Sequence, residues 1–352
     1  MNAEPEILFE RRGAAGIVML NRPYSLNAVT HAMVRTLAAT LAEWAKNKAV
    51  TRVVVTAAGE RAFSAGGDLR ALYELGCAGR HAEALQFWRD EYMLNTLIKR
   101  YPKPYIALID GIVMGGGVGV SVHGSHRVVG DRFQFAMPEA GIGFFPDVGA
   151  TWFLPRMPGE IGTYCALTGE RIKNADAAYS GIATHYVTSQ RFPALLEALC
   201  ESEPVDAVLA SFAEKLGLGA LSIYQKAIDR LFAANRVEDI LTALDRETIA
   251  RSTESGWAGA TAAAIRGKSP VSLKIALAQL RRGRDWSFTQ CMRAEFRIVS
   301  RIVHGHDFYE GVRAVIVEKD NAPRWDPPHL SNVLDGDIDR YFAPLETELD
   351  LP

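Results

Sequence analysis

The chain has 352 residues, of which 48% are hydrophobic and 23% charged, as in an ordinary globular protein. Its 39 basic and 41 acidic side chains nearly cancel, so we expect neither nucleic acid nor a membrane as a partner. The four cysteines lie far apart and form no CxxC pair, which argues against a disulfide framework and a zinc site. Together with an acidic start that lacks an apolar leader, they favour a cytoplasmic location.

The first half of the chain alternates short apolar runs with amphipathic segments. Residues 7–9 and 16–20 are typical of a hairpin, and residues 30–45 predict a helix with Thr30 as its N-cap. Further strands are expected at residues 53–56, 106–108, 127–129 and 182–187, and helices at residues 69–75 and 162–167. Strands that alternate with helices predict a layered α/β core, which we place at residues 1–190.

Helical patterns dominate the second half, at residues 193–199, 237–244, 271–281 and 288–303. From residue 326 onward the chain carries seven acidic residues and a single arginine. We therefore predict a helical region over residues 191–352 that completes or covers a site formed by the first half.

Two glycine-rich segments each follow a predicted strand. Residues 65–68 precede a helical pattern, and Gly115, Gly116 and Gly117 form a second run. Glycines let the backbone approach a ligand closely, and free N–H groups at a helix start attract an oxyanion. Neither run fits G-x-G-x-x-G, so a dinucleotide fingerprint is not supported. By pattern alone, an ordinary turn or close backbone packing explains these glycines equally well.

Two carboxylates stand among apolar residues and glycines. Glu139 follows Met137 and Pro138, and Asp147 follows two phenylalanines and a proline. Such surroundings raise a carboxyl pKa and suit acid–base or nucleophilic chemistry. The alternative is structural, with Glu139 capping one helix and Asp147 starting the next. His304, His306 and Asp307 could chelate a metal, but no distant ligand group completes a site, so we expect none.

Three segments in chain order resemble the motifs of the crotonase (enoyl-CoA hydratase/isomerase) family, namely residues 21–28, 63–68 and 110–119. The resemblance implies a ββα spiral core and an acyl-CoA substrate. It also implies that the backbone N–H groups of Gly67 and Gly116 hold the thioester oxygen, and it places Arg22, Leu26 and Asp68 in substrate-binding segments.

One position separates the branches of this family. Hydratases carry a first glutamate shortly after the glycine run, where this chain has Gly119. Glu139 together with Asp147 resembles the family's thioester hydrolases instead. The resemblance then implies cleavage of 3-hydroxyisobutyryl-CoA to 3-hydroxyisobutyrate and CoA, within valine catabolism.

The resemblance implies further contacts around the substrate. Glu91 would line the acyl pocket, although a solvated helix glutamate is the alternative, and Arg22 and Lys319 would meet the CoA phosphates. No metal or redox cofactor is implied, and a homo-oligomer is compatible with the sequence. The alternative functions are an enoyl- or dienoyl-CoA isomerase or hydratase of the same family, and a catalytically silent CoA-binding protein.

Overall fold

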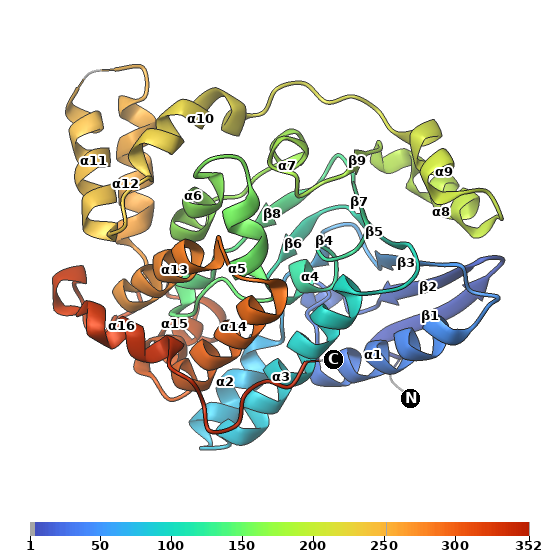
Figure 1. Ribbon diagram of the computed structural model, residues 1–352, viewed down its shortest axis with the longest axis horizontal. Helices are drawn as coiled ribbons and strands as arrows, with labels where there is room; N and C mark the ends of the chain where they lie inside the picture. The colour runs from blue at the N-terminus through green and yellow to red at the C-terminus, as the bar shows by residue number, and fades with distance from the viewer. Residues whose placement is uncertain (1–3, 251, 352) are drawn as a thin grey trace.

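Two β-sheets form the centre of the protein in the computed structural model, which describes residues 4–250 and 252–351 (Figure 1). The larger sheet has the strand order β1-β2-β3-β5-β7-β9, and the smaller sheet has the order β4-β6-β8. In the larger sheet the strands are β1 (Ile7–Arg12), β2 (Ala15–Leu20), β3 (Arg52–Ala57), β5 (Tyr105–Ile109), β7 (His126–Val129) and β9 (His185–Tyr186). The smaller sheet contains β4 (Ala62–Ser64), β6 (Ile112–Met114) and β8 (Gln134–Ala136).

The order in which the chain visits the two sheets makes a spiral. A strand of the larger sheet is followed by a strand of the smaller sheet and then by a helix, as in β3, β4 and α2 (Leu69–Cys77). The same order recurs in β5, β6 and α4 (Gly116–Gly119). Within each sheet, neighbouring strands of this spiral are parallel, whereas β1 and β2 form an antiparallel hairpin. The predicted ββα spiral core is confirmed.

Helices surround the sheets and fill the second half of the chain (Figure 1). Those that precede residue 190 also include α1 (His31–Lys46), α3 (His81–Lys99), α5 (Ala150–Phe153), α6 (Ile161–Thr168) and α7 (Asn174–Ser180). Those that follow are α8 (Phe192–Cys200), α9 (Val205–Phe212), α10 (Ala220–Leu231), α11 (Val237–Ile249), α12 (Ser255–Arg266), α13 (Pro270–Gly283), α14 (Phe288–Ile302), α15 (His306–Val312) and α16 (Asp335–Phe342). Within the described residues, no helix combines the length and the apolar character that a membrane span requires.

The predicted elements agree with the structure where their patterns are long. The helix predicted at residues 30–45 is α1, and its N-cap Thr30 accepts the Met33 N–H at 3.2 Å. The strand predicted at residues 182–187 is only the two-residue β9. Strands β4, β6 and β8 were not predicted, because three residues are too few to show an alternating pattern.

Both faces of the larger sheet are buried. Successive strand residues point to opposite faces, so Val54 and Ile106 face α8 and α9, whereas Val53, Val55 and Ala107 join the main core. Helices α8 and α9 follow residue 190 in the sequence and still pack on this sheet (Figure 1). Burial on both faces explains why β3 and β5 are continuous apolar runs without alternation.

Candidate active site

Two glycine turns meet at the ends of neighbouring strands. Strands β4 and β6 are parallel, so the turns that follow them leave the same edge of the smaller sheet. Gly66 has a φ of +114° and Gly115 a φ of +44°, backbone conformations in which a side chain would be strained. A β-carbon on Gly116 would lie 3.1 Å from the Gly67 nitrogen. Within the described residues, neither the Gly67 nor the Gly116 N–H donates a hydrogen bond.

A small cavity of about 60 Å³ lies against these turns. Both glycine segments line it together with the carboxylates Glu91, Glu139 and Asp147, all predicted from the sequence. An apolar wall completes the lining, formed by Leu72, Phe87, Trp88, Ile142 and Phe144. The rings of Trp88 and Phe144 stack with their centroids 5.6 Å apart. The cavity therefore joins two amide donors, three carboxylates and an apolar surface.

Glu139 begins a short 3-10 turn (Glu139–Ile142) and is only 5% exposed. A β-carbon on Gly115 would lie 3.4 Å from its Oε1, so the carboxyl group faces the second glycine turn. Its Oε2 finds no hydrogen-bond partner within residues 4–250 and 252–351. Burial raises the pKa of Glu139 well above its ordinary value, and the charge of Asp147 adds to the effect. A buried carboxyl with a free oxygen is suited to act on a bound molecule.

Asp147 is 4% exposed and lies in the loop that precedes α5. The Tyr92 hydroxyl of α3 donates to its Oδ2 at 2.9 Å. Burial raises the pKa of Asp147 to about 7, although the Tyr92 hydrogen bond opposes the rise. The carboxylate points to Tyr92 and the cavity, and α5 begins only at Ala150, so Asp147 does not start that helix.

Glu91 lies on the buried face of α3 and is only 2% exposed. Its Oε1 would lie 2.5 Å from a β-carbon on Gly116, and this oxygen has no partner in the described part of the chain. Burial raises the pKa of Glu91 well above its ordinary value, with the charges of Asp147 and Glu295 adding to it. The alternative of a solvated helix glutamate is wrong.

Gly119, where hydratases carry a glutamate, is closely enclosed. A β-carbon there would lie 2.8 Å from Asn95 Nδ2 and 2.9 Å from Val148 Cβ. Such distances are too short for ordinary contacts, so a side chain at this position requires its neighbours to move.

Two polar side chains near the cavity were not predicted from the sequence. Tyr92 binds Asp147, and Glu295 of α14 is fully buried behind the same loop. A signal for Glu295 exists, because it falls on the apolar stripe of its helix together with Met292, Phe296 and Val299. A glutamate on such a stripe predicts a buried carboxylate with a specific partner.

Four residues predicted to contact the substrate lie outside the cavity lining, namely Arg22, Leu26, Asp68 and Lys319. Arg22 pairs with Asp68 at 3.0 Å and with Glu6 at 3.1 Å, and its role at the CoA phosphates stays a prediction. Asp68 also caps α2 by accepting the Ala71 N–H. Lys319 is exposed, and its role at the CoA phosphates stays a prediction.

The spiral core and the two glycine turns agree with the comparisons with known proteins. A family model described as enoyl-CoA hydratase/isomerase matches residues 15–342, and the chain belongs to this family. The curated relatives include a zebrafish (Danio rerio) protein named 3-hydroxyisobutyryl-CoA hydrolase, mitochondrial. It is 43% identical over 354 residues, which cover 98% of this chain and 91% of the relative. A human (Homo sapiens) relative of the same name is 40% identical, covering 98% of this chain and 90% of that protein.

Solved structures with the same fold carry other names. One is described as a carnitinyl-CoA dehydratase from Mycobacterium thermoresistibile, with 42% identity, a TM-score of 0.92 and coverage of 98% of both chains. Another is described as an enoyl-CoA hydratase from Rhodobacter sphaeroides 2.4.1. It is 38% identical with a TM-score of 0.90, and the match covers 97% of this chain and 98% of that one. The likeness spans the helical second half as well as the spiral core.

The expectation of a cytoplasmic location is wrong by these comparisons, because the zebrafish, rat and human relatives are named mitochondrial. Free cysteines are compatible with any reducing compartment, so their spacing does not separate the two locations. Location is set by targeting signals that are independent of the fold and its site.

Proposed function

We propose that this protein hydrolyses 3-hydroxyisobutyryl-CoA to 3-hydroxyisobutyrate and CoA, as a step of valine catabolism. The observation that carries the proposal is the burial of Glu139 and Asp147 beside the amides of Gly67 and Gly116 in one cavity. The names of the zebrafish, rat and human relatives support this reaction and substrate over the isomerase and the silent CoA-binding alternatives.

In the proposed reaction, the Gly67 and Gly116 N–H groups form an oxyanion hole for the thioester oxygen. The ionised carboxylate of Glu139 attacks the carbonyl carbon, and the negative charge passes to the thioester oxygen, where both donors stabilise it. Collapse of this intermediate breaks the C–S bond, releases CoA as a thiolate and leaves a mixed anhydride on Glu139. Water then cleaves the anhydride, which frees the acid and restores the carboxylate.

Asp147 is the proton donor and acceptor in this scheme. Because burial raises its pKa to about 7, the carboxyl group exchanges a proton readily near neutral pH. It protonates the departing thiolate and recovers a proton from the water that opens the anhydride. Tyr92 keeps Asp147 in place through the hydroxyl that donates to its Oδ2.

A second route uses the same residues without a covalent step, with Glu139 as a general base that activates water. A single turnover in ¹⁸O-water tests the covalent route. Opening of an anhydride at the enzyme's carbonyl leaves label in the Glu139 carboxylate, whereas Glu139 acting as a general base, or water that opens the anhydride at the acyl carbon, leaves none. Either result is compatible with thioester hydrolysis.

The cavity suits a short acyl chain that carries a hydroxyl group. Its apolar wall of Trp88, Phe87 and Phe144 fits a small branched chain. We propose that Glu91 or Asp147 binds the acyl hydroxyl. No metal or redox cofactor is required, since the thioester contains its own leaving group and the protein supplies the nucleophile. The scheme is compatible with a homo-oligomer.

A hydratase is the second candidate, because the two similar solved structures are described as a dehydratase and a hydratase. Hydration in this family's usual form needs two glutamates, and the enclosed Gly119 leaves no room for the first. We therefore expect negligible addition of water to crotonyl-CoA.

The test is a thiol-release assay with 3-hydroxyisobutyryl-CoA, acetyl-CoA and crotonyl-CoA, run alongside an assay of double-bond hydration. We expect the fastest release from 3-hydroxyisobutyryl-CoA. Hydration of crotonyl-CoA without thiol release would replace the hydrolase proposal with the hydratase.

A further inference from the structure

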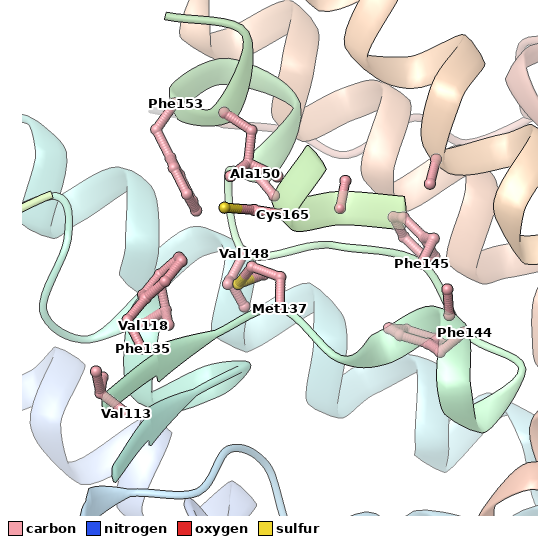
Figure 2. Packing of buried hydrophobic residues seen from close by; sticks show 14 of the residues in the cluster. Val113, Val118, Phe135, Met137, Phe144, Phe145, Val148, Ala150, Phe153 and Cys165 are labelled. Carbon is pink, nitrogen blue, oxygen red and sulfur yellow. The ribbon is translucent and has the colours of Figure 1, made fainter. Parts of the chain in front are cut away.

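The loop of residues 146–151, whose last two residues begin α5, carries Asp147 into the cavity and contains a strained backbone. Val148 has a φ of +51°, in the left-handed region that a β-branched residue rarely adopts. Its side chain is fully buried and lies beside Met137 in the apolar cluster (Figure 2). Strain of this kind persists only where surrounding groups fix the conformation. The contacts that hold this loop therefore also determine where Asp147 lies.

Glu295 of α14 makes two of these contacts. Its Oε2 accepts the Gly149 N–H at 2.7 Å and its Oε1 accepts the Thr151 N–H at 2.9 Å, so both carboxyl oxygens bind the loop. The side chain is fully buried, and it is not among the residues that line the cavity. Burial raises the pKa of Glu295 to about 8, with the charge of Asp147 adding to the rise and the two N–H donors opposing it.

Two more buried side chains hold the loop's carbonyl groups. Gln279 of α13 donates to the Pro146 oxygen at 2.5 Å. His123 Nε2 lies 2.6 Å from the Val148 oxygen, and burial lowers the pKa of His123 to about 3, so its neutral ring donates this hydrogen bond. The loop backbone is thus fixed by side chains from parts of the sequence up to about 150 residues away.

We propose that Glu295 is a positioning residue, whose carboxyl group holds the strained loop so that Asp147 stays at the cavity. It acts through the loop and does not touch the substrate. The inference rests on the proposed hydrolase function, because it assigns Glu295 a part in the same reaction. A glutamate buried only to stabilise α14 would affect stability without a specific effect on turnover.

The test compares Glu295→Gln with Ile298→Ala. Gln presents one acceptor oxygen and one NH₂ group, so it keeps one loop hydrogen bond and opposes the other N–H with a donor. Ile298 is fully buried on the same helix, and its truncation weakens packing without removing a loop contact. In assays above pH 8, where Glu295 is ionised, we expect kcat to fall by about 10²-fold in Glu295→Gln, the cost of a small misplacement of a reacting group, with KM unchanged. Ile298→Ala should lower Tm and leave kcat near that of the wild type.

A second readout does not depend on activity. Hydrogen exchange of the peptide that covers residues 146–153 should speed up in Glu295→Gln and stay as in the wild type in Ile298→Ala. If Glu295→Gln fails to fold, Glu295→Asp keeps the carboxyl group but shortens the side chain, so it cannot reach both N–H groups and should give the same two changes. Wild-type kcat, or unchanged exchange of this peptide, in a folded Glu295→Gln would overturn the inference.

The two proposals fail in different ways. A wild-type protein that releases no thiol would overturn the proposed function, while faster exchange in Glu295→Gln would still show that Glu295 holds the loop.

Discussion

The two sides of the cavity are built by different means. On one side, Gly67 and Gly116 offer backbone amides, each from a short turn directly after a strand of the smaller sheet. On the other side, Glu139 and Asp147 offer side chains, and the loop of Asp147 depends on contacts from α3, α13 and α14. The amide side is local in the sequence, whereas the carboxylate side is assembled from distant segments. We therefore expect the amide side to be damaged by substitutions that add side-chain atoms. The carboxylate side should be damaged by substitutions that remove a charge or a contact to the loop of Asp147.

The largest effect is expected on the carboxylate side. Glu139→Gln keeps the shape of the side chain but removes both the nucleophile and the base, so thiol release should fall by about 10⁴-fold or more. Binding of the substrate should be spared, because the amide side is unchanged. Turnover and substrate affinity are measured together, with Glu43→Gln on the exposed surface of α1 as the control. Full activity in Glu139→Gln would contradict the assignment of the site.

The amide side is tested by two substitutions of one glycine. Gly116→Ala and Gly116→Pro both add a β-carbon that crowds Glu91 Oε1, but only the proline removes the N–H donor. Both variants should be impaired. If the N–H stabilises an oxyanion, kcat of the proline variant should lie a further 10²-fold or so below that of the alanine variant. Equal rates in the two folded variants would mean that Gly116 is required only for packing.

The smallest expected effect is on the dependence of Tm on pH. Burial raises the pKa of Asp147 to about 7 and that of Glu295 to about 8, so between their ordinary values of about 4 and these values the folded state binds more protons than the unfolded state. The stabilisation from a raised carboxyl pKa is complete at low pH and is lost as the pH rises through the folded-state value. Tm should therefore fall as the pH rises from about 5 to 8, because the free energy of unfolding drops by up to about 1.4 kcal/mol per pH unit for each proton.

Asp147→Asn isolates the contribution of Asp147 to the pH dependence of Tm from that of Glu295. The variant should show a shallower fall of Tm between about pH 5 and 7 than the wild type, measured by calorimetry in matched buffers. A slope equal to that of the wild type would mean that Asp147 titrates as an ordinary exposed carboxylate.

The sequence predicted more of the amide side than of the contacts that hold the carboxylate side in place. The two glycine runs have compact patterns, the family resemblance implied Gly67 and Gly116 as their donors, and both residues line one cavity in the structure. Arg22 shows the limit of this reasoning, because the sequence does not reveal its ion pairs with Glu6 and Asp68. Glu91 shows the converse, since burial alone separates a solvated helix glutamate from one at a cavity.

By itself the sequence determined the alternation of strands and helices, the positions of the two glycine turns, and the absence of a carboxylate at Gly119. These features depend on backbone conformation and on neighbours a few residues away, which residue type and spacing report directly. Only the tertiary structure decided that Tyr92, Gln279 and Glu295 meet the loop of Asp147. Such contacts join segments up to about 150 residues apart, and no local pattern encodes which buried polar groups will pair.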